Sequence, residues 1–322
     1  MTPHKLRWGI IGCGSVVLKK SGPSILQAGN HRIVGVMRRQ PEKARPFAEA
    51  HGIGLCTSDA AELIHHPEVD VVYIATPPSS HKDYVLAAAA AGKHILVEKP
   101  MGLSAAEDHE MIDACTKAGV ELFVAYYRRF HPHVIKMRQL LREGIIGKPL
   151  LARVNFAQPA PDGHDWGWRI DPKTSGGGLF VDVVSHRIDL LNDLLGEPVM
   201  THGHVSSPAH GQETASLLVS YSSGSAASIL GDFTSTRKQD YFAIHGTSGS
   251  LVAQNLDGHA FELRTPGGSQ AFTFEPASAP HLGLVQHIGL VLSGETPNAT
   301  SGRQALQTDR ILDDGYRAGS RI

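Results

Sequence analysis

A lysine that follows a short apolar run is the residue of this sequence best placed for chemistry. Residues 94–97 (His-Ile-Leu-Val) predict a buried strand, because they are mostly apolar and follow a break at Gly92. Lys99 comes just after that strand, and Pro100 behind it disfavours helical backbone at the lysine. Ligands of open α/β sheets bind beyond the carboxyl ends of the strands. We therefore expect Lys99 to be catalytic; the alternative is an ordinary surface lysine at a strand end.

A second group of ionisable residues follows the triple glycine 176–178. Asp182, His186 and Asp189 have the i, i+4, i+7 spacing, so a helix would carry all three on one face. An imidazole beside a carboxylate is a general acid/base near neutral pH, and the glycines predict bare backbone donors at the helix N-terminus. Two alternatives are a metal ion shared by His186 and Asp182 and a surface salt bridge between them. No second cluster of ligands is evident, so we expect no metal.

A glycine-rich turn, Gly12-Cys13-Gly14, connects an apolar strand at residues 6–12 to a helix-compatible segment at residues 16–28. In that context Gly12 would permit the tight turn, and Gly14 would let backbone approach a pyrophosphate at the helix N-terminus. Val17 stands where a third small residue is usual. The pattern predicts dinucleotide binding, with an ordinary strand-to-helix turn as the alternative.

The next predicted strand, residues 32–37, ends in two arginines. An acidic residue at this position binds the ribose of NAD, whereas arginine accommodates the 2′-phosphate of NADP. Arg38 and Arg39 follow the strand, and neither Met37 nor Gln40 is acidic. We therefore favour NADP(H) over NAD(H), because a guanidinium matches phosphate geometry. The alternative is a solvated basic loop.

The elements around these residues alternate regularly through the first third of the chain. Residues 69–75 predict a further buried strand broken by Thr76 and Pro77, residues 81–91 a helix, and residues 120–126 another strand. Ser104 and Glu107 form a capping box that opens the intervening helix. Alternating strands and helices predict a doubly wound parallel sheet, an α/β Rossmann domain over residues 1–125.

The second half of the sequence has a different pattern of apolar and polar residues. After a helix that ends near Arg142, short alternating runs are separated by glycines, at residues 199–205, 214–221, 225–233, 240–245, 250–252 and 261–264. Such runs predict an antiparallel sheet that buries one face and can offer the other to a partner. Residues 126–322 therefore form an α+β C-terminal domain with a large, mostly antiparallel sheet.

Composition narrows the possible partners and compartment. The 322 residues are 41% hydrophobic, and 30 Lys+Arg against 31 Asp+Glu give a net charge of −1. This balance argues against nucleic acid or a membrane as partner. Cys13, Cys56 and Cys115 form no CxxC pair, no apolar run has the length of a membrane span, and the N-terminus shows no signal peptide. We expect a cytoplasmic protein.

The chain resembles the Gfo/Idh/MocA oxidoreductase family nearly end to end. Residues 75–78, His81 and residues 92–100 match its most recognisable segment, and residues 177–189 match its second. The resemblance implies a two-domain dehydrogenase or reductase that moves hydride between nicotinamide and a carbonyl or hydroxyl carbon, commonly of a sugar or cyclitol. It also implies that the Lys99–Pro100 bond is often cis. A homodimer or homotetramer through the C-terminal sheet is expected as well.

The resemblance further implies roles for individual residues. Lys99 would hold the reacting oxygen and stabilise its negative charge, His186 would exchange the hydroxyl proton, and Asp182 would orient His186 or bind a neighbouring hydroxyl. Arg169 and Tyr127, which stands where many members have asparagine, are expected to contact the substrate. The residues expected around the cofactor are Gly12, Gly14, Ser15, Val16, Arg38, Arg39, Thr76, Pro77, His81, Glu98 and Lys99.

Two other functions occur on folds of this kind. One is a glycoside hydrolase that uses tightly bound NAD, and the other is a catalytically silent sugar-sensing regulator. The arginines after the second strand argue against the first, and the presence of both Lys99 and His186 argues against the second. The 19 histidines, among them His131, His164 and His281, offer polar contacts without identifying a substrate.

Overall fold

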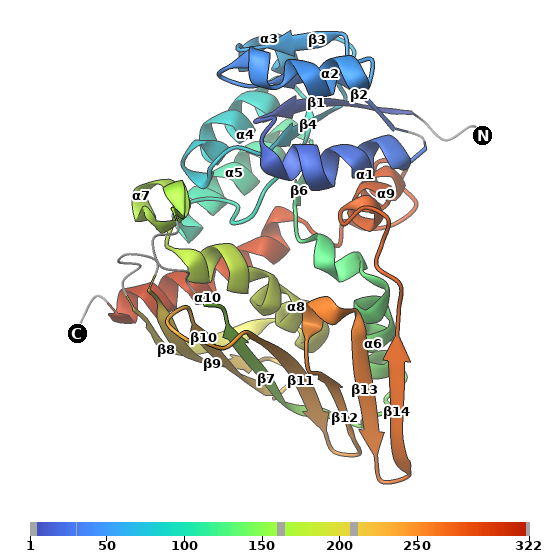
Figure 1. Cartoon of the computed structure of the whole chain (residues 1–322), viewed down its shortest axis with the longest axis vertical. Coiled ribbons are helices and arrows are strands. Elements are labelled where there is room, and N and C mark those ends of the chain that lie inside the picture. The colour runs from blue at the N-terminus through green and yellow to red at the C-terminus, as the bar shows by residue number, and fades with distance from the viewer. Residues whose placement is uncertain (1–4, 30, 160–164, 207–211, 320–322) are drawn as a thin grey trace. The chain divides into compact units, whose positions relative to one another are not determined.

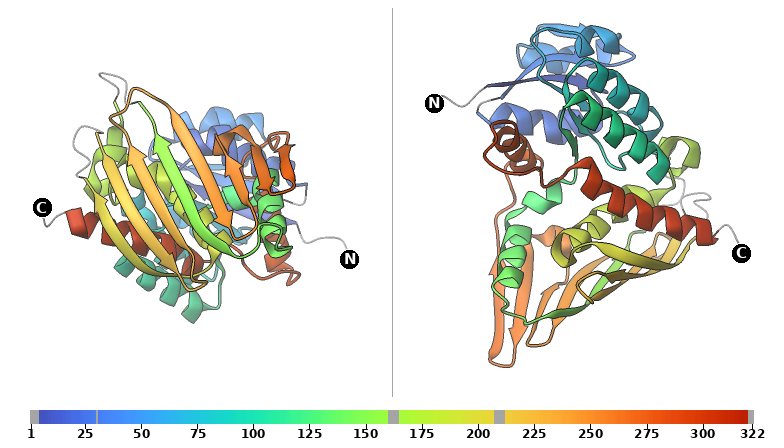
Figure 2. Two further views of the ribbon diagram at one scale, coloured as in Figure 1. Left: turned by 90° about the horizontal axis from the view of Figure 1, so that it is seen from below. Right: turned by 180° about the vertical axis from the view of Figure 1, so that it is seen from behind.

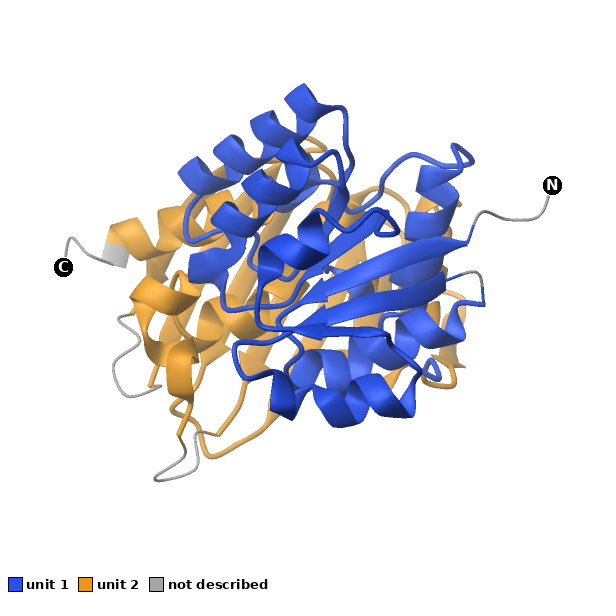
Figure 3. Ribbon diagram, turned by 90° about the horizontal axis from the view of Figure 1, so that it is seen from above, with its two compact units in different colours: residues 1–127, 277–306 blue, residues 128–276, 307–322 orange. Residues whose placement is uncertain are grey.

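A computed structural model of the chain describes residues 5–29, 31–159, 165–206 and 212–319. The chain forms two compact units, shown in separate colours in Figure 3. Unit 1 comprises residues 1–127 and 277–306, and unit 2 comprises residues 128–276 and 307–322. His164 lies outside the described residues.

Unit 1 is built on a six-stranded, fully parallel sheet with the strand order β3-β2-β1-β4-β5-β6 (Figure 1). The strands are β1 (Leu6–Ile11), β2 (His31–Met37), β3 (Leu55–Thr57), β4 (Val71–Ile74), β5 (His94–Val97) and β6 (Leu122–Val124). Every residue of β4 is buried, as expected for a parallel strand with both faces covered. The predicted doubly wound sheet is confirmed.

The helical segments of unit 1 follow its strands. They are the π-helix η1 (Val17–Ser21), α1 (Gly22–Gln27), η2 (Pro41–Lys43), α2 (Arg45–Ala50), α3 (Ala60–Ile64), η3 (Pro78–Ser80), α4 (His81–Ala90), α5 (Ala105–Ala118) and α9 (Leu282–Leu292). The strand order reverses between β1 and β4, because the chain leaves β1 toward β2 and β3 and returns to β4 on the other side. The carboxyl ends of β1 and β4 therefore flank the position where open α/β sheets bind ligands.

Residues 277–306 return to unit 1, which corrects the prediction of a single boundary near residue 125. The reason is the unpaired edge of β6. The Val124 amide donates to the carbonyl of Thr300 at 2.8 Å, and Phe123 forms an antiparallel bridge with Ser301. This late segment thus covers the edge of the parallel sheet.

Unit 2 contains an eight-stranded sheet with the order β14-β13-β12-β11-β7-β10-β9-β8. Its strands are β7 (Pro149–Ala157), β8 (Pro198–Val205), β9 (Thr214–Tyr221), β10 (Ala226–Asp232), β11 (Gln239–Gly246), β12 (Ser250–Ala253), β13 (Ala260–Thr265) and β14 (Gly268–Thr273). Only the pairing of β7 with β10 is parallel within this described sheet. The predicted large, mostly antiparallel sheet is confirmed.

The helices of unit 2 pack against one face of that sheet. Buried side chains of α6 (Pro132–Arg142), α8 (Ser185–Leu195) and α10, such as Met137, Leu191 and Ile311, share a core with the inward residues of the strands. The other helical segments are η5 (Gly167–Ile170), α7 (Pro172–Ser175), the π-helix η6 (Phe180–Val184) and η8 (Leu256–Gly258). Both η4 (Tyr127–Phe130) and α10 (Gly302–Gly319) cross a boundary between the units.

The opposite face of the sheet is open in Figure 2 (left), where no described helix of unit 2 lies on it. Large apolar side chains are exposed on four adjacent strands, at Leu150, Val199, Met200, Leu218 and Leu230. Among the described residues, no helix combines the length and apolar character that crossing a membrane requires.

Candidate active site

The glycine-rich turn lies where β1 approaches the segment after β4. Gly12 has a φ of +94°, and an added Cβ would stand 2.7 Å from the Ala75 carbonyl. The amides of Gly12 and Cys13 both donate to the carbonyl of Met37, at 3.0 and 3.1 Å. Around Gly14 an added Cβ would meet no atom closer than 3.8 Å. The turn therefore needs glycine at its first position and leaves open space at the second, as a close backbone approach to a pyrophosphate requires.

The residues after this turn begin a helical segment that widens into the π-helix η1. Ser15 is exposed and Val16 is half-buried, whereas Val17 is fully buried. Val17 replaces the usual third small residue of the motif, and the π-helical turn accommodates it in the core. Such turns are rare and occur frequently at functional sites.

Arg38 lies against the glycine-rich turn. Its Nη1 donates to the Cys13 carbonyl at 3.1 Å, and its amide donates to the Thr57 carbonyl at 3.0 Å. The side chain is half-buried, while that of Arg39 is exposed. The structure thus brings Arg38 to the predicted nucleotide site and leaves Arg39 in solvent at its margin.

The segment after β4 is held by its own polar groups. The Ser80 hydroxyl lies 2.8 Å from Thr76 Oγ1 and donates to the Pro77 carbonyl at 2.9 Å. His81 is fully buried; its Nε2 lies 2.8 Å from the Thr76 carbonyl, and its Nδ1 lies 3.1 Å from the carbonyl of Pro100. Burial lowers the pKa of His81, against the effect of these carbonyls. His81 therefore connects the two segments that follow β4 and β5, and its direct contact with the cofactor stays a prediction.

Glu98 anchors the segment that carries Lys99. Tyr73 donates to Glu98 Oε1 at 2.6 Å, and His281 Nε2 lies 3.6 Å from the same oxygen, within ion-pair distance when the imidazole is protonated. Burial alone would raise the pKa of Glu98, but His281, the Tyr73 hydroxyl and Lys99 outweigh it and lower that pKa. Burial and Glu98 raise the pKa of Tyr73 well above its ordinary value. Glu98 is thus a fixed, ionised carboxylate.

Lys99 follows this carboxylate directly. Its amide donates to Glu98 Oε2 at 3.4 Å, its side chain is half-buried, and its peptide bond to Pro100 is cis, as the resemblance implies. Tyr127 lies in the same unit, where its ring packs on His281 with centroids 4.1 Å apart. The contact of Tyr127 with a substrate stays a prediction.

Unit 2 holds the residues predicted to act as acid and base, on a helical segment that starts as a π-helix. Asp182 lies in η6, and His186 is buried on the first turn of α8. Arg169 Nε donates to Asp182 Oδ2 at 3.0 Å, and the guanidinium carbon lies 4.8 Å from the centroid of the Trp168 ring. The structure therefore joins Arg169 and Asp182, two residues expected at the substrate.

Two features of this helix correct the prediction. Asp189 accepts from Arg129 Nε at 2.7 Å and from its Nη2 at 2.5 Å, with both side chains buried, so it belongs to a structural ion pair. The N-terminal donors are not bare either, because the Phe180 amide donates to Glu213 at 3.0 Å. Burial raises the pKa of Glu213, which also accepts from the Tyr316 hydroxyl.

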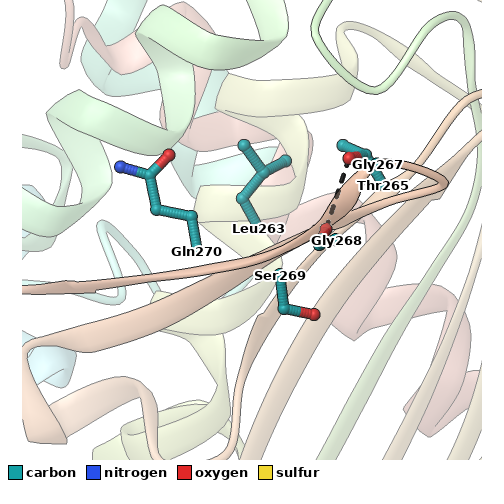
Figure 4. Close-up of a pocket in the computed structure, with 6 residues that line it drawn as sticks. All are labelled: Leu263, Thr265, Gly267, Gly268, Ser269 and Gln270. Carbon is teal, nitrogen blue, oxygen red and sulfur yellow. Dashed lines mark hydrogen bonds between the residues drawn. The ribbon is translucent and has the colours of Figure 1, made fainter.

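Unit 1 thus carries Lys99 and the nucleotide-side residues, and unit 2 carries Asp182, His186 and Arg169. A further depression lies on the β13–β14 hairpin (Figure 4). Its lining residues are Leu263, Thr265, Gly267, Gly268, Ser269 and Gln270. It contains none of the predicted site residues and no ionisable side chain, so it offers no acid/base chemistry.

Comparison with known proteins identifies the family. A family model described as an oxidoreductase family with an NAD-binding Rossmann fold matches residues 6–126, and one for the GFO/IDH/MocA C-terminal domain matches residues 134–252. The chain belongs to the Gfo/Idh/MocA family. This confirms the resemblance and the prediction of a nicotinamide-dependent oxidoreductase that acts on CH–OH groups.

Several relatives of this Gfo/Idh/MocA chain span nearly its whole length. Oxidoreductase P35 of Formosa agariphila is 35% identical, covering 90% of this chain and 99% of the relative. A 1,5-anhydro-D-fructose reductase of Ensifer adhaerens is 31% identical over 91% and 90%. A solved levoglucosan dehydrogenase, in complex with NADH and levoglucosan, is 23% identical over 98% and 97%, with a TM-score of 0.87, and shows the same fold.

Sequence reasoning gave no role to three residues that support the predicted site. Tyr73 is a polar-tipped ring inside an apolar strand, a pattern that predicts a buried hydrogen-bond partner. His281 and Glu213 carry no such signal, because their partners Glu98 and Phe180 lie far away in the sequence.

Proposed function

We propose that this Gfo/Idh/MocA enzyme prefers NADP(H) and interconverts a carbonyl and a hydroxyl carbon of a sugar, cyclitol or related small molecule. The observation that carries the cofactor preference is Arg38 lying against the glycine-rich turn, with no acidic residue at the end of β2. The open space at Gly14 fits a pyrophosphate. A bound nicotinamide supplies or accepts the hydride.

We assign the remaining chemistry to three side chains. The ammonium of Lys99 stabilises negative charge on the reacting oxygen, on a segment that the buried Glu98 fixes. His186 takes the hydroxyl proton during oxidation and returns it during reduction. Asp182, itself held by Arg169, orients His186 or binds a neighbouring substrate hydroxyl.

The substrate class is supported by what relatives are named for. Matching proteins include a D-xylose 1-dehydrogenase (NADP(+)) of Haloferax volcanii and a myo-inositol 2-dehydrogenase of Thermotoga maritima. Keto-sugars and aldehydes with NADPH, and sugars and polyols with NADP+, are therefore the compounds to screen first.

The test is a titration of the purified protein with NADPH and with NADH, followed by nicotinamide fluorescence. Arg39→Ala is the sharper variant, because Arg38 also holds the glycine-rich turn and its loss would disturb both cofactors. We expect Arg39→Ala to weaken NADPH by about 10-fold or more with little change for NADH, as loss of a charge-assisted hydrogen bond predicts. The exposed Arg45 of α2 provides the matched control, Arg45→Ala.

Equal losses of affinity for NADPH and NADH in Arg39→Ala would refute the role of Arg39 in binding the phosphate. Preference of the unmodified protein for NADH would refute the NADP assignment and direct the search toward polyol oxidation. NAD released only on denaturation would replace the proposal with the hydrolase function.

We also propose a cytoplasmic homodimer or homotetramer assembled through the open face of the eight-stranded sheet. Leu218 and Leu230 are 61% and 47% exposed on adjacent strands, more than an isolated sheet face needs. All three cysteines are free, as a reducing compartment favours. Light scattering after gel filtration tests this: Leu218→Glu with Leu230→Glu should yield monomers, and an unmodified protein that is monomeric would refute it.

A further inference from the structure

Three histidines from two segments of unit 2 that are distant in sequence come together, and none of them has a role in the function proposed above. The ring nitrogens that His131, His133 and His259 can offer to a metal all lie within 4.8 Å of one another. We propose that these three histidines form a binding site for one divalent ion of the zinc class. The sequence predicted no metal, because His259 lies more than a hundred residues from the other two.

The three histidines lie at the ends of helical segments. His131 is the N-cap of α6, and His133 lies on its first turn. His259 follows η8 and leads into β13. The ring centroids of His133 and His259 are 5.1 Å apart, and His131 lies 5.6 and 5.5 Å from them, with no two rings parallel. The rings converge without stacking, as ligands around one ion do.

The burial of this histidine cluster leaves ring nitrogens without hydrogen-bond partners, which a bound ion would supply. The Nδ1 atoms of His133 and His259 are buried and make no hydrogen bond, and His133 is only 1% exposed. A buried polar atom without a partner lowers the stability of the folded chain.

The backbone at His259 is a second, independent sign. Its φ is +54°, and it is the one non-glycine residue with positive φ among those the structure describes. This left-handed conformation is uncommon for residues other than glycine. The Phe274 amide donates to the His259 carbonyl at 3.0 Å and helps to hold it. Unfavourable backbone of this kind clusters at ligand sites.

The donor set selects the ion. Three imidazoles without a carboxylate suit zinc, nickel, copper or cobalt rather than magnesium or calcium. Tetrahedral zinc places its nitrogen ligands roughly 3.4 Å apart, given Zn–N bonds of about 2.0–2.1 Å, so the three rings need only small rotations to close on it. The charge of Arg128 opposes a cation, but Arg128 is paired with Asp257, which also accepts from Arg187 at 3.2 Å.

The consequence of binding would be a link between α6 and the segment that leads from η8 into β13. An ion held only by the folded chain stabilises it by an amount that grows with the logarithm of one plus the ratio of ion concentration to Kd. The proposed metal takes no part in hydride transfer, so this inference and the proposed function fail independently.

The test uses the full chain without a histidine tag, stripped with a chelator and then titrated with Zn²⁺ by calorimetry and with Co²⁺ by visible absorption. His259→Asn keeps a residue that tolerates positive φ, and His131→Asn keeps a good N-cap, so both variants should fold. The double variant His202→Asn with His204→Asn is the control, because these residues of β8 are the other closely spaced histidine pair in unit 2.

We expect one equivalent of Zn²⁺ to bind the unmodified chain and the control, with tetrahedral Co²⁺ absorption and a higher Tm. Each cluster variant should bind at least about tenfold more weakly, since even loss of an indirect partner of a metal ligand costs that much. Circular dichroism confirms that the variants are folded. Unchanged zinc affinity in both variants, or no stoichiometric binding by the unmodified chain, would overturn the proposal.

Discussion

Replacing Tyr73 with phenylalanine removes the hydroxyl that fixes Glu98 beside Lys99. The bond is 2.6 Å long, both side chains are buried, and the lowered pKa of Glu98 makes the acceptor ionised at neutral pH. Hydrogen bonds to charged groups contribute about 1.5–3 kcal/mol. We therefore expect Tyr73→Phe to lower the free energy of unfolding by about 2 kcal/mol at pH 7.5, roughly a 30-fold change in the folding equilibrium.

The assay is urea unfolding followed by tryptophan fluorescence, to which Trp8, buried in β1 of the same unit, contributes. The control is Tyr84→Phe, because Tyr84 is a half-buried tyrosine on α4. Since the folded pKa of Glu98 is lowered, its stabilisation is present above the unfolded pKa and is lost as pH falls through the folded pKa. The difference between Tyr73→Phe and the unmodified chain should therefore shrink below about pH 4.5. A loss at pH 7.5 no larger than that of the control would refute this account of Glu98.

Three further predictions concern single residues. Lys99→Ala should leave NADPH affinity within a few-fold and lower turnover by about two orders of magnitude; near-normal turnover would remove Lys99 from the mechanism. Burial lowers the pKa of His31 to about 4, so this residue alone should reduce the free energy of unfolding by about 2 kcal/mol when the pH falls from 7.5 to 5. The variant His31→Gln should lack this contribution; the same pH dependence of urea unfolding in both proteins would contradict the prediction. Gly177→Ala should lower the unfolding free energy by about 1–3 kcal/mol, because an added Cβ would overlap Val181. Gly54→Ala is the control: the space around Gly54 is open, so this change should leave the free energy of unfolding by urea nearly unchanged.

Local patterns predicted which strands precede Gly12 and Lys99. Gly12 and Lys99 were placed by the strands that precede them, and those strands are runs of adjacent apolar residues. β7 was not predicted, although Ala152, Val154 and Phe156 alternate with more exposed neighbours and carry the signal of a half-buried strand.

Partners distant in sequence could not be predicted. Asp189 has the right spacing for an acid/base face, but it forms a buried ion pair with Arg129, which lies 60 positions earlier in the sequence. The helix N-terminus expected after Gly178 is not bare, because the Phe180 amide donates to Glu213, the residue just before β9. Spacing along a helix fixes which residues share a face, but not what the rest of the chain places against that face.

The return of residues 300 and 301 to the edge of β6 has a consequence for how the protein is made. On the ribosome, strands β1 to β6 emerge long before the segment that covers their edge, since all of unit 2 except its last residues is synthesised in between. During that interval β6 presents unpaired backbone groups, a template for pairing with another chain. A fragment cut at residue 125 would keep that edge exposed permanently. We expect such a fragment to aggregate, whereas one in which residues 277–306 are joined back to residue 127 through a flexible linker should fold.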